Sequence, residues 1–425
     1  MTVVEVRAAA DQLLFLHERF SPLFGRVEAR KQSLVYINGL LLGTGRKSAE
    51  PMALNFGEPG DDGISQNQVL ALQRFLTYSP WSAQSVEREV QAVFAEKLMP
   101  STCDWPIGAV GVIDESGFVK QGTHSVGVQR QYCGHVGKKE NCQMGVFLVG
   151  VTPAGSALLD DQLYLPRVWA DDAERRKEAG VPEEIEFRTK PQIASELLKR
   201  TRDHGLVKFD WVTADEFYGH NGEFLGDLEK AEQRYVVEIP VNTTVWTVDP
   251  QTQIPPYKGQ GTRPTRARRD SVRSVRAIAA DLPASAWQAL QLRMGAKGPL
   301  AFEFARVRAW AVRHRQAGPP CWLVLRRSLE TDAEVKYYLA WTPADESLQT
   351  PLETMALVTG TRYRVEEFLE EGKSYLGMDQ YEARAWSSWH HHMSLVALAH
   401  LYVTLTRQQL KKKLPSLPWT WPCVC

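Results

Sequence analysis

The chain has 425 residues, of which 44% are hydrophobic, and its formal net charge at pH 7 is zero. This length predicts two or three domains with ample apolar material for their cores. A zero net charge excludes a global field that attracts nucleic acid, so any such binding must come from local patches. The sequence contains no run of 18 or more apolar residues, so we expect no membrane span. The acidic residues Glu5 and Asp11 argue against a signal peptide, and we expect a cytoplasmic protein.

Metal binding through cysteine or histidine is one alternative to consider. Two sets of residues could supply zinc ligands: Cys133 with His135 and Cys142, and the run His390, His391 and His392. The cysteine spacing matches no common zinc pattern, and consecutive histidines on a helix point in different directions. We therefore do not expect zinc. His391 or His392 should instead pack against Trp386 or Trp389.

Residues 1–100 carry apolar side chains at helical spacing over 3–24 and 67–98, which predicts a helical N-terminal domain. Ser79-Pro80 and Ser82 predict a turn and an N-cap before a further helix. Between the two helical stretches lies a polar segment with Arg46, Lys47 and a Gly/Asp-rich run. A helical domain with a basic loop can read DNA, so Arg46 and Lys47 are candidate DNA contacts.

From residue 107 the pattern changes to short apolar runs separated by turn residues. Three strands of a meander are followed by a charged helix at 168–180, a helix at 191–205, a strand ending at Asp215 and a strand at 234–241. The first strand should end at Asp114, with a turn at Ser116-Gly117. An aspartate at a strand end is ordinarily a turn former. Here both Asp114 and Asp215 follow an apolar strand and precede a glutamate, which favours a shared crevice.

Residues 242–350 break this order and predict a β-rich insertion with one short helix near 284–293. Its loop holds a cluster of arginines: Arg263, Arg266, Arg268, Arg269, Arg273 and Arg276. Clustered guanidinium groups suit phosphate contacts, although a solvated loop would show the same composition. Trp246 is a candidate for stacking on an unpaired base.

The stretch from Arg362 to Leu376 predicts a helix whose apolar arc consists of Val365, Phe368, Leu369, Gly372 and Leu376. Glu366 lies on the rim of this arc, and Glu367 lies nearly opposite it. Arg362, Glu366, Glu370 and Lys373 form a ladder along the rim. A solvated charged face would also produce this pattern, but only a rim position lets a carboxylate reach a site beside the core. A long buried helix at 387–407 and a basic tail with three lysines should follow.

Asp114, Asp215 and Glu366 are the three carboxylates that we expect to meet in one site. Three acidic groups at one place repel one another unless cations bind, and two divalent ions about 3.5–4 Å apart would resolve the repulsion. Oxygen-only ligands select Mg²⁺, for which Mn²⁺ can substitute. Such a pair of ions suits the cleavage and transfer of phosphodiesters.

These pieces together resemble a DDE transposase of a bacterial insertion sequence. The resemblance is carried by VIDESGFVKQGTHSVGVQRQYCG around Asp114, by WVTADEFYG around Asp215, and by the signature Tyr-x2-Arg-x3-Glu-x6-Lys at Arg362, Glu366 and Lys373. It covers roughly residues 105–405. The signature tyrosine position holds Thr359, and Tyr363 is nearby but out of phase.

The resemblance implies a mixed α/β fold with a ribonuclease H-like sheet and flanking helices. The implied domains are helical and DNA-binding at 1–100, catalytic at 101–241, a β-rich insertion at 242–350, catalytic helices at 351–410 and a tail at 411–425. The implied activity is cut-and-paste transposition. The implied partners are double-stranded DNA, as terminal inverted repeats and target, and a second protomer. Arg362 and Lys373 would steady phosphates, and the protein would work at the nucleoid.

Two other functions stay open at this point. One is a ribonuclease H-like nuclease without strand transfer. The other is a non-catalytic DNA-binding regulator that descends from a transposase. The presence of all three carboxylates argues against the regulator.

Overall fold

A computed structural model describes residues 3–43, 45–57, 66–254, 256–257, 259–263, 265, 272–295, 298–313, 316–329, 334–344, 346 and 349–413. The chain forms two compact units. Unit 1 comprises Met1–Cys103, Asp114–Lys208 and Arg364–Cys425, and unit 2 comprises Asp104–Ile113 and Phe209–Tyr363. Strand β1 (Val110–Val119) contributes its first four residues to unit 2 and the remainder to unit 1.

Unit 1 begins with helices, as the apolar spacing predicts. They are α1 (Val3–Phe20), η1 (Ser21–Phe24), α2 (Val27–Leu42), α3 (Ala49–Phe56), α4 (Gln66–Thr77), α5 (Ala83–Lys97) and η2 (Met99–Thr102). Ser82 caps α5 by accepting a hydrogen bond from the backbone N–H of Ser85 at 3.2 Å, which confirms the expected N-cap. Helices α2 and α3 lie between residues 24 and 67, a stretch for which the sequence predicts a polar loop.

The strands of unit 1 are β2 (Gln129–Cys133), β3 (Lys138–Thr152), β4 (Gly155–Tyr164) and the second part of β1. Strand β3 pairs antiparallel with both β2 and β4 and neighbours β1. The chain continues through η3 (Gly134–Val136), α6 (Arg167–Ala170), α7 (Ala173–Glu178) and α8 (Lys190–His204), and α8 packs on β3 and β4. The three expected strands are present, but they do not form a meander, because β3 lies between β1 and β2 in the sheet. The helical stretch expected at 168–180 consists of the two short helices α6 and α7, and the helix expected at 191–205 is α8.

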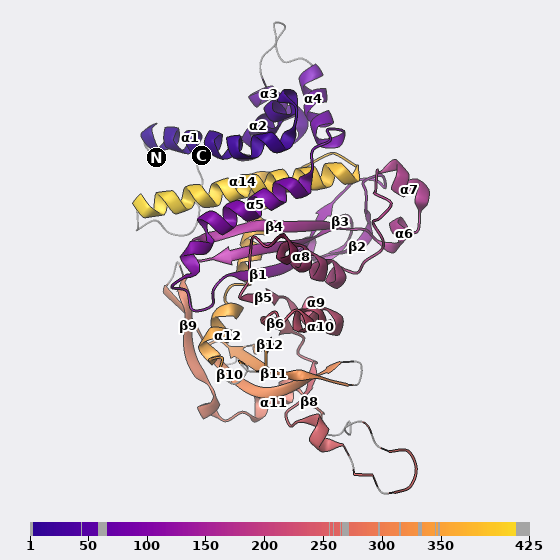
Figure 1. Cartoon of the computed structure of the whole chain (residues 1–425), viewed down its shortest axis with the longest axis vertical. Helices are drawn as coiled ribbons and strands as arrows, with labels where there is room; N and C mark the ends of the chain where they lie inside the picture. Colours follow the sequence, from indigo (N-terminus) through magenta and orange to yellow (C-terminus); the bar gives the residue numbers. More distant parts are fainter. Residues whose placement is uncertain are drawn as a thin grey trace. The chain divides into compact units, whose positions relative to one another are not determined.

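Two C-terminal helices complete unit 1: α13 (Tyr363–Leu376) and α14 (Trp386–Lys413), of which α13 begins at the last residue of unit 2. Helix α14 contacts β4 and α5 on one side and α1, α2 and α4 on the other (Figure 1). Gly145 on β3 lies against this helix, because a Cβ atom there would approach the ring of Trp389 to 2.8 Å. The predicted long buried helix is therefore the central element of this unit.

Unit 2 contains a sheet in the order β1, β5, β6, β12, β11, β10, β7, β8, with β9 paired to β10. The bounds are β5 (Trp211–Ala214), β6 (Tyr235–Ile239), β7 (Thr244–Trp246), β8 (Val272–Ser274), β9 (Gln288–Gly295), β10 (Gly298–Arg313), β11 (Gln316–Arg327) and β12 (Lys336–Trp341). Strands β1, β5 and β6 run parallel, and the others pair antiparallel. Because β12 pairs with β6, the β-rich stretch shares the sheet of β5 and β6 rather than forming a sheet of its own.

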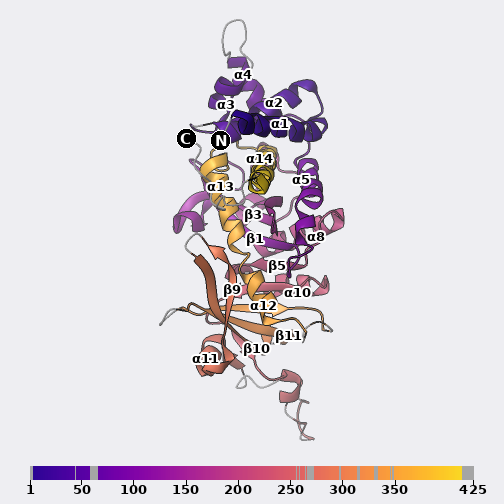
Figure 2. The same ribbon diagram turned by 90° about the vertical axis from the view of Figure 1, so that its left-hand side faces the viewer.

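The helices of unit 2 are short: α9 (Glu216–Gly219), α10 (Gly222–Lys230), η4 (Pro250–Gln253), α11 (Val275–Asp281), η6 (Ala284–Ala286) and α12 (Leu352–Thr359). Figure 2 shows α12 beside β9, β10 and β11, and α12 contacts β5, β6, β9 and β10. Strands and helices of both units form a mixed α/β architecture with flanking helices, as the ribonuclease H-like expectation requires.

Two local predictions are wrong. The turn expected at Ser116-Gly117 is absent, because β1 continues to Val119 and both residues are buried within it. The helix expected near 284–293 is a single 3-10 turn followed by β9, whose residues pair with β10. In both places pairing with a neighbouring strand outweighs the local sequence preference.

Candidate active site

Asp114 lies in the middle of β1 rather than at a strand end, and its side chain is half-buried. Its Oδ1 accepts a hydrogen bond from the backbone N–H of Glu115 at 2.7 Å. The side chain of Glu115 pairs in turn with the Nζ of Lys190, the first residue of α8, at 2.9 Å. This ion pair is four-fifths buried on both sides, so it holds the strand that carries Asp114 against α8.

Helix α13 presents Glu366 in its first turn, and the side chain of Glu366 is exposed. Below it the apolar arc is buried as predicted: Val365, Phe368, Gly372 and Leu376 are buried and Leu369 is half-buried. Phe368 packs edge-on against His400 of α14, with ring centroids 4.9 Å apart. The burial of the arc fixes the rotation of the helix and therefore the direction of Glu366.

The neighbouring glutamates of α13 differ in their surroundings. Glu367 pairs with Arg364 at 2.8 Å. Glu371 pairs with Arg407 at 2.8 Å and lies 3.5 Å from His400. Burial alone would raise the pKa of Glu371, but its hydrogen bonds with His400 and Arg407 outweigh burial and lower that pKa to about 2. Glu367 and Glu371 therefore serve contacts inside unit 1.

Asp215 directly follows β5 in unit 2 and is the N-cap of α9. Its Oδ1 accepts hydrogen bonds from the backbone N–H groups of Phe217 at 3.0 Å and Tyr218 at 3.4 Å. The turn is fixed from its other end, because Gly219 lies so close to the carbonyl oxygen of Glu238 that no Cβ atom fits there. The strand end predicted at Asp215 is confirmed, and its carboxylate position depends on this tight turn.

The two units divide the three expected carboxylates between them. Asp114 and Glu366 belong to unit 1, and Asp215 belongs to unit 2. In the part of the chain that the structure describes, no three histidine, cysteine, aspartate or glutamate side chains form a group that could hold a metal ion. Either unit alone supplies at most two of the three carboxylates. Their donor set consists of carboxylate oxygens alone, which fits Mg²⁺ or Mn²⁺ rather than zinc.

Lys373 does not lie on the surface, where a phosphate contact would require it. Its side chain is 7% exposed, and its Nζ donates a hydrogen bond to the carbonyl oxygen of Gly117 in β1 at 3.0 Å. Burial lowers the pKa of this amine. The expected phosphate contact by Lys373 is therefore not supported. The lysine instead ties α13 to β1 three residues beyond Asp114, which makes it a positioning residue.

Arg362 is half-buried in unit 2 and lies 3.5 Å from Glu238, which also pairs with Lys336 at 2.7 Å. The residue at the signature tyrosine position, Thr359, is buried at the end of α12, where its hydroxyl donates to the carbonyl oxygen of Ala356 at 2.7 Å. Neither side chain extends freely from the surface.

Among the other predicted DNA contacts, two are wrong. Lys47 is 6% exposed, and its Nζ donates to the carbonyl oxygens of Leu40 and Tyr375 in unit 1. Trp246 is 4% exposed within the sheet of unit 2, so it has no surface for stacking on a base.

Arg46 and Arg263 are exposed, as a DNA contact requires. Arg46 pairs loosely with Glu382 at 3.1 Å. Arg266, Arg268 and Arg269 lie outside the described residues.

The three histidines at the start of α14 have separate structural roles. His391 stacks on Trp81 with ring centroids 3.7 Å apart, and its two ring nitrogens hydrogen-bond the carbonyl oxygens of Leu76 and Trp81. His392 hydrogen-bonds the hydroxyl of Tyr36 at 2.7 Å. The predicted packing partners, Trp386 and Trp389, instead contact His390.

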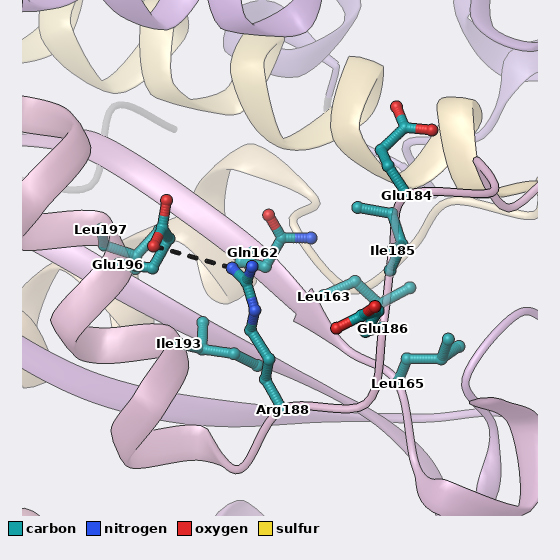
Figure 3. A pocket seen from close by; sticks show the side chains of 10 residues that line it. All are labelled: Gln162, Leu163, Leu165, Glu184, Ile185, Glu186, Arg188, Ile193, Glu196 and Leu197. Carbon is teal, nitrogen blue, oxygen red and sulfur yellow. Dashed lines mark ion pairs between the residues drawn. The ribbon is translucent and has the colours of Figure 1, made fainter. Parts of the chain in front are cut away.

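A pocket in unit 1 lies between β4, the segment that precedes α8, and α8 itself (Figure 3). Its apolar lining includes Leu163 and Ile193. Arg188 reaches toward Glu196 across its mouth, with the nitrogen and oxygen 3.7 Å apart, and Glu184 and Glu186 also line it. Because carboxylates outnumber the single arginine, this pocket does not suit a nucleic-acid phosphate.

Two groups of residues with notable contacts in the structure are not predicted from the sequence. One is Lys190, which pairs beside Asp114. The other is a set of arginines stacked on aromatic rings of β10 and β11. The second has a visible signal, because Arg306 and Arg308 alternate with apolar residues and must therefore share one face of a strand.

Comparison with known proteins identifies a protein family that this chain matches. A model described as "DDE superfamily endonuclease" matches residues 19–299, a range that includes Asp114 and Asp215 but ends before Glu366. A probable transposase for the insertion sequence element IS701 of Microchaete diplosiphon is 30% identical over 244 residues. That similarity covers 56% of this chain and 57% of the relative, so the chain spans little more than half of the relative's length.

Two solved structures show weak similarity. A piggyBac transposase synaptic complex with hairpin DNA aligns over 93% of this chain and 74% of that chain, with a TM-score of 0.41 and 9% identity. The NurA nuclease from Sulfolobus solfataricus aligns over 79% of this chain and 94% of that chain, with a TM-score of 0.27 and 10% identity. Similarity at this level identifies no shared function. The match of the family model over most of the chain does identify the family, and the chain belongs to the DDE superfamily endonucleases.

Proposed function

We propose that this protein is the transposase of an insertion sequence and that Asp114, Asp215 and Glu366 are its catalytic carboxylates. One observation carries the proposal. In unit 2, β1 and β5 are parallel, and Ile113 and Ala214 are register partners at the last paired position. Asp114 and Asp215 are the next residues along these two strands. The two aspartates therefore start from neighbouring backbone positions, although 101 residues separate them in sequence.

Glu366 would supply the third carboxylate from the exposed first turn of α13. The three side chains would hold two Mg²⁺ ions, which when bound supply Lewis acidity at the phosphate and lower the pKa of an attacking water or hydroxyl. The chain's own part is to hold the carboxylates in place and correctly directed. Lys373 and the Lys190–Glu115 pair do this for the β1 strand, and the Asp215 turn does it for β5.

The reaction would begin with hydrolysis at the end of the element, which frees a 3′-hydroxyl. That hydroxyl would then attack the opposite strand or target DNA. The partners would be terminal inverted repeats and target DNA, held by two protomers at the nucleoid of a bacterial cell. Arg46 and Arg263 are exposed and could contribute phosphate contacts, together with the arginines between 263 and 276. In the described residues no helix is long and apolar enough to cross a bilayer.

The test is the Asp114→Ala variant on a DNA duplex that carries the element's end, with Mg²⁺ present. We expect cleavage to be lost and DNA binding to be retained, because the carboxylate acts on chemistry and not on docking. The matched control is Asp104→Ala, which changes an exposed aspartate near the start of unit 2. Cleavage by Asp114→Ala at the wild-type rate would exclude the assignment.

A second assay separates a transposase from a nuclease that cannot transfer strands. A pre-cut element end and a target plasmid are incubated with the full chain and Mg²⁺. We expect a joined product. Cleavage of intact ends without any joined product would leave the endonuclease activity and exclude strand transfer.

A further inference from the structure

One face of the β10–β11 hairpin in unit 2 carries a tryptophan between two arginines. Arg308 and Trp322 are direct register partners, and Arg306 lies two residues away on the same face of β10. The guanidinium carbon of Arg306 is 4.3 Å from the centroid of the Trp322 ring, and that of Arg308 is 5.1 Å away. Both distances are within the range of cation–π attraction, so the ring orients the two charged groups.

The same face holds a second stack further along β11. The guanidinium carbon of Arg326 lies 4.7 Å from the ring centroid of Phe302 and 5.7 Å from that of Tyr338. Arg326 belongs to this face because it is an even-numbered position of β11, as Trp322 is, and its register partner is Phe304. Stacking leaves the edges of a guanidinium, and therefore its N–H donors, directed away from the ring.

The arginines on the two faces of the hairpin have different partners. Among the described residues, Arg306 and Arg326 form no ion pair; Arg306 donates to the carbonyl oxygen of Thr350 at 2.6 Å and interacts with the carboxylate of Glu353 only from beyond ion-pair distance. On the opposite face, Arg327 pairs at 2.7 Å with Glu303, its direct register partner. Arg327 also lies over an aromatic ring, yet it has a carboxylate. Stacked arginines that serve only internal packing would be expected to have such partners on both faces.

We propose that the Arg306–Arg326 face, which consists of Arg306, Arg308, Trp322 and Arg326, binds the phosphate backbone of DNA during the reaction proposed above. Arginines that are already held in place lose little side-chain entropy when they bind a phosphate. All four residues are half-buried, so each keeps part of its surface exposed while it packs in the stack. Contacts of this kind carry no base information and would hold any DNA sequence. The inference rests on the proposed function, because it assumes a DNA substrate.

The experiment measures equilibrium binding of the full chain to a DNA duplex over a series of NaCl concentrations, without divalent ions. The variant replaces Arg306, Arg308 and Arg326 with glutamine. Each phosphate contact contributes about 0.9 to the slope of log K against log salt. We expect the triple variant to lose about 2 to 3 from that slope and to bind roughly tenfold or more weakly at low salt.

The matched control is Arg327→Gln, which removes an arginine of the same hairpin from the opposite face. Its slope should equal that of the wild type. Circular dichroism and thermal unfolding check that each variant folds. If the triple variant does not fold, Arg306→Gln and Arg326→Gln are measured singly, and each should lower the slope by about 1.

The outcomes distinguish this proposal from the one on which it rests. A wild-type slope in folded triple or single variants, while wild-type protein still binds and cleaves DNA, would overturn the Arg306–Arg326 face alone. Failure of the wild-type protein to bind any DNA would overturn both proposals. Loss of slope in the arginine variants with an unchanged slope in Arg327→Gln would support the assignment.

Discussion

Two sets of three carboxylates among the described residues have opposite surroundings. The first set is Asp114, Asp215 and Glu366, which are half-buried or exposed. The second set lies entirely within unit 1 and consists of Glu87 on α5 with Asp160 and Asp161 on β4. These three are 4%, 1% and 1% exposed. The same residue types therefore occur once at accessible positions and once in a core.

The buried set is neutralised from inside the protein. Arg200 of α8 forms two hydrogen bonds with Asp160, and the Nε–Oδ2 distance is 2.8 Å. His390 of α14 lies 3.7 Å from Asp161, whose two carboxylate oxygens have no hydrogen-bond partner among the described residues. Burial raises the pKa of Glu87 and of Asp160, and it raises the pKa of Asp161 to about 7. Burial thus favours the protonated form of these carboxylates, and one guanidinium pairs with Asp160.

The comparison teaches that the number of acidic residues does not identify a catalytic site. Carboxylate ligands of a metal ion must be ionised and accessible to it, and burial with a raised pKa works against both conditions. Asp114 and Glu366 remain accessible although both are attached to well-packed elements. The difference between the two sets can be tested by removing one member or one counter-charge from each.

The largest expected effect is on activity, in the Glu366→Gln variant. The substitution keeps the size of the side chain and removes its charge, so cleavage should fall by roughly 10²–10³ or more, the scale for losing one group that stabilises a transition state. The rate of cleavage of a labelled element end is the measurement. Glu367→Gln is the matched control. Glu367 is the next residue along the helix after Glu366, and its side chain pairs with Arg364.

The same series checks the rotation of α13. Glu371→Gln should keep its activity but unfold more easily, because Glu371 pairs with Arg407 and His400. An inactive Glu370→Gln together with an active Glu366→Gln would show that a different face of the helix serves the site.

The next effect is on stability, in the Arg200→Met variant. Methionine retains most of the side-chain volume but leaves Asp160 without its counter-charge beside Glu87 and Asp161. Breaking a buried ion pair from one side costs about 3–5 kcal/mol, and urea unfolding monitored by circular dichroism would measure the loss. Lys199→Met is the control on the same helix, because the exposed Lys199–Asp203 pair should contribute little. Equal unfolding midpoints in the two variants would mean that Arg200 does not balance the buried set.

The sequence pattern predicts the accessible carboxylates better than the buried ones. The strand end at Asp215 and the apolar arc below Glu366 follow from residue order, because a turn and a helical period are local properties. The buried set could not be found in this way, since Glu87, Arg200 and His390 come from three helices and meet only after packing. Asp160 and Asp161 follow an apolar run and lie inside a strand, as Asp114 also does, so residue order alone does not separate the buried aspartates from the accessible one.

Lysine positions were the least predictable feature. Lys47 and Lys373 stand in charged stretches of sequence, which suggested exposed phosphate contacts. In the structure both amines bind backbone carbonyl oxygens in the interior of unit 1. A long aliphatic stem allows a lysine to be buried or exposed at the same backbone position, so the outcome depends on which carbonyl groups the fold leaves within reach. Sequence period alone carries no information about those groups.

The smallest expected effect concerns pH and the Asp161→Asn variant. In the unfolded chain an aspartate titrates near pH 4, whereas burial raises the pKa of Asp161 in the folded protein to about 7. Between these values only the folded state holds the proton, so this group makes the protein less stable as the pH rises through that window. Asparagine stays neutral throughout. The variant should therefore gain stability over the wild type as the pH rises, by on the order of 1 kcal/mol for each pH unit between about 4 and 7, so that the difference at pH 8 clearly exceeds the difference at pH 5.

The difference between the two proteins reports Asp161 together with its effect on neighbouring groups, because the charge of Asp161 acts on Glu87, Asp160 and Arg200. Burial lowers the pKa of His390 to about 3, and this group makes both proteins less stable as the pH falls from about 6.5. Urea unfolding at pH 5, 6.5 and 8 measures the difference directly. The exposed Asp171→Asn is the control, for which the difference should not vary with pH. A difference for Asp161→Asn that is equally flat would mean that Asp161 is ionised in the core, and the buried set would then need a cation after all.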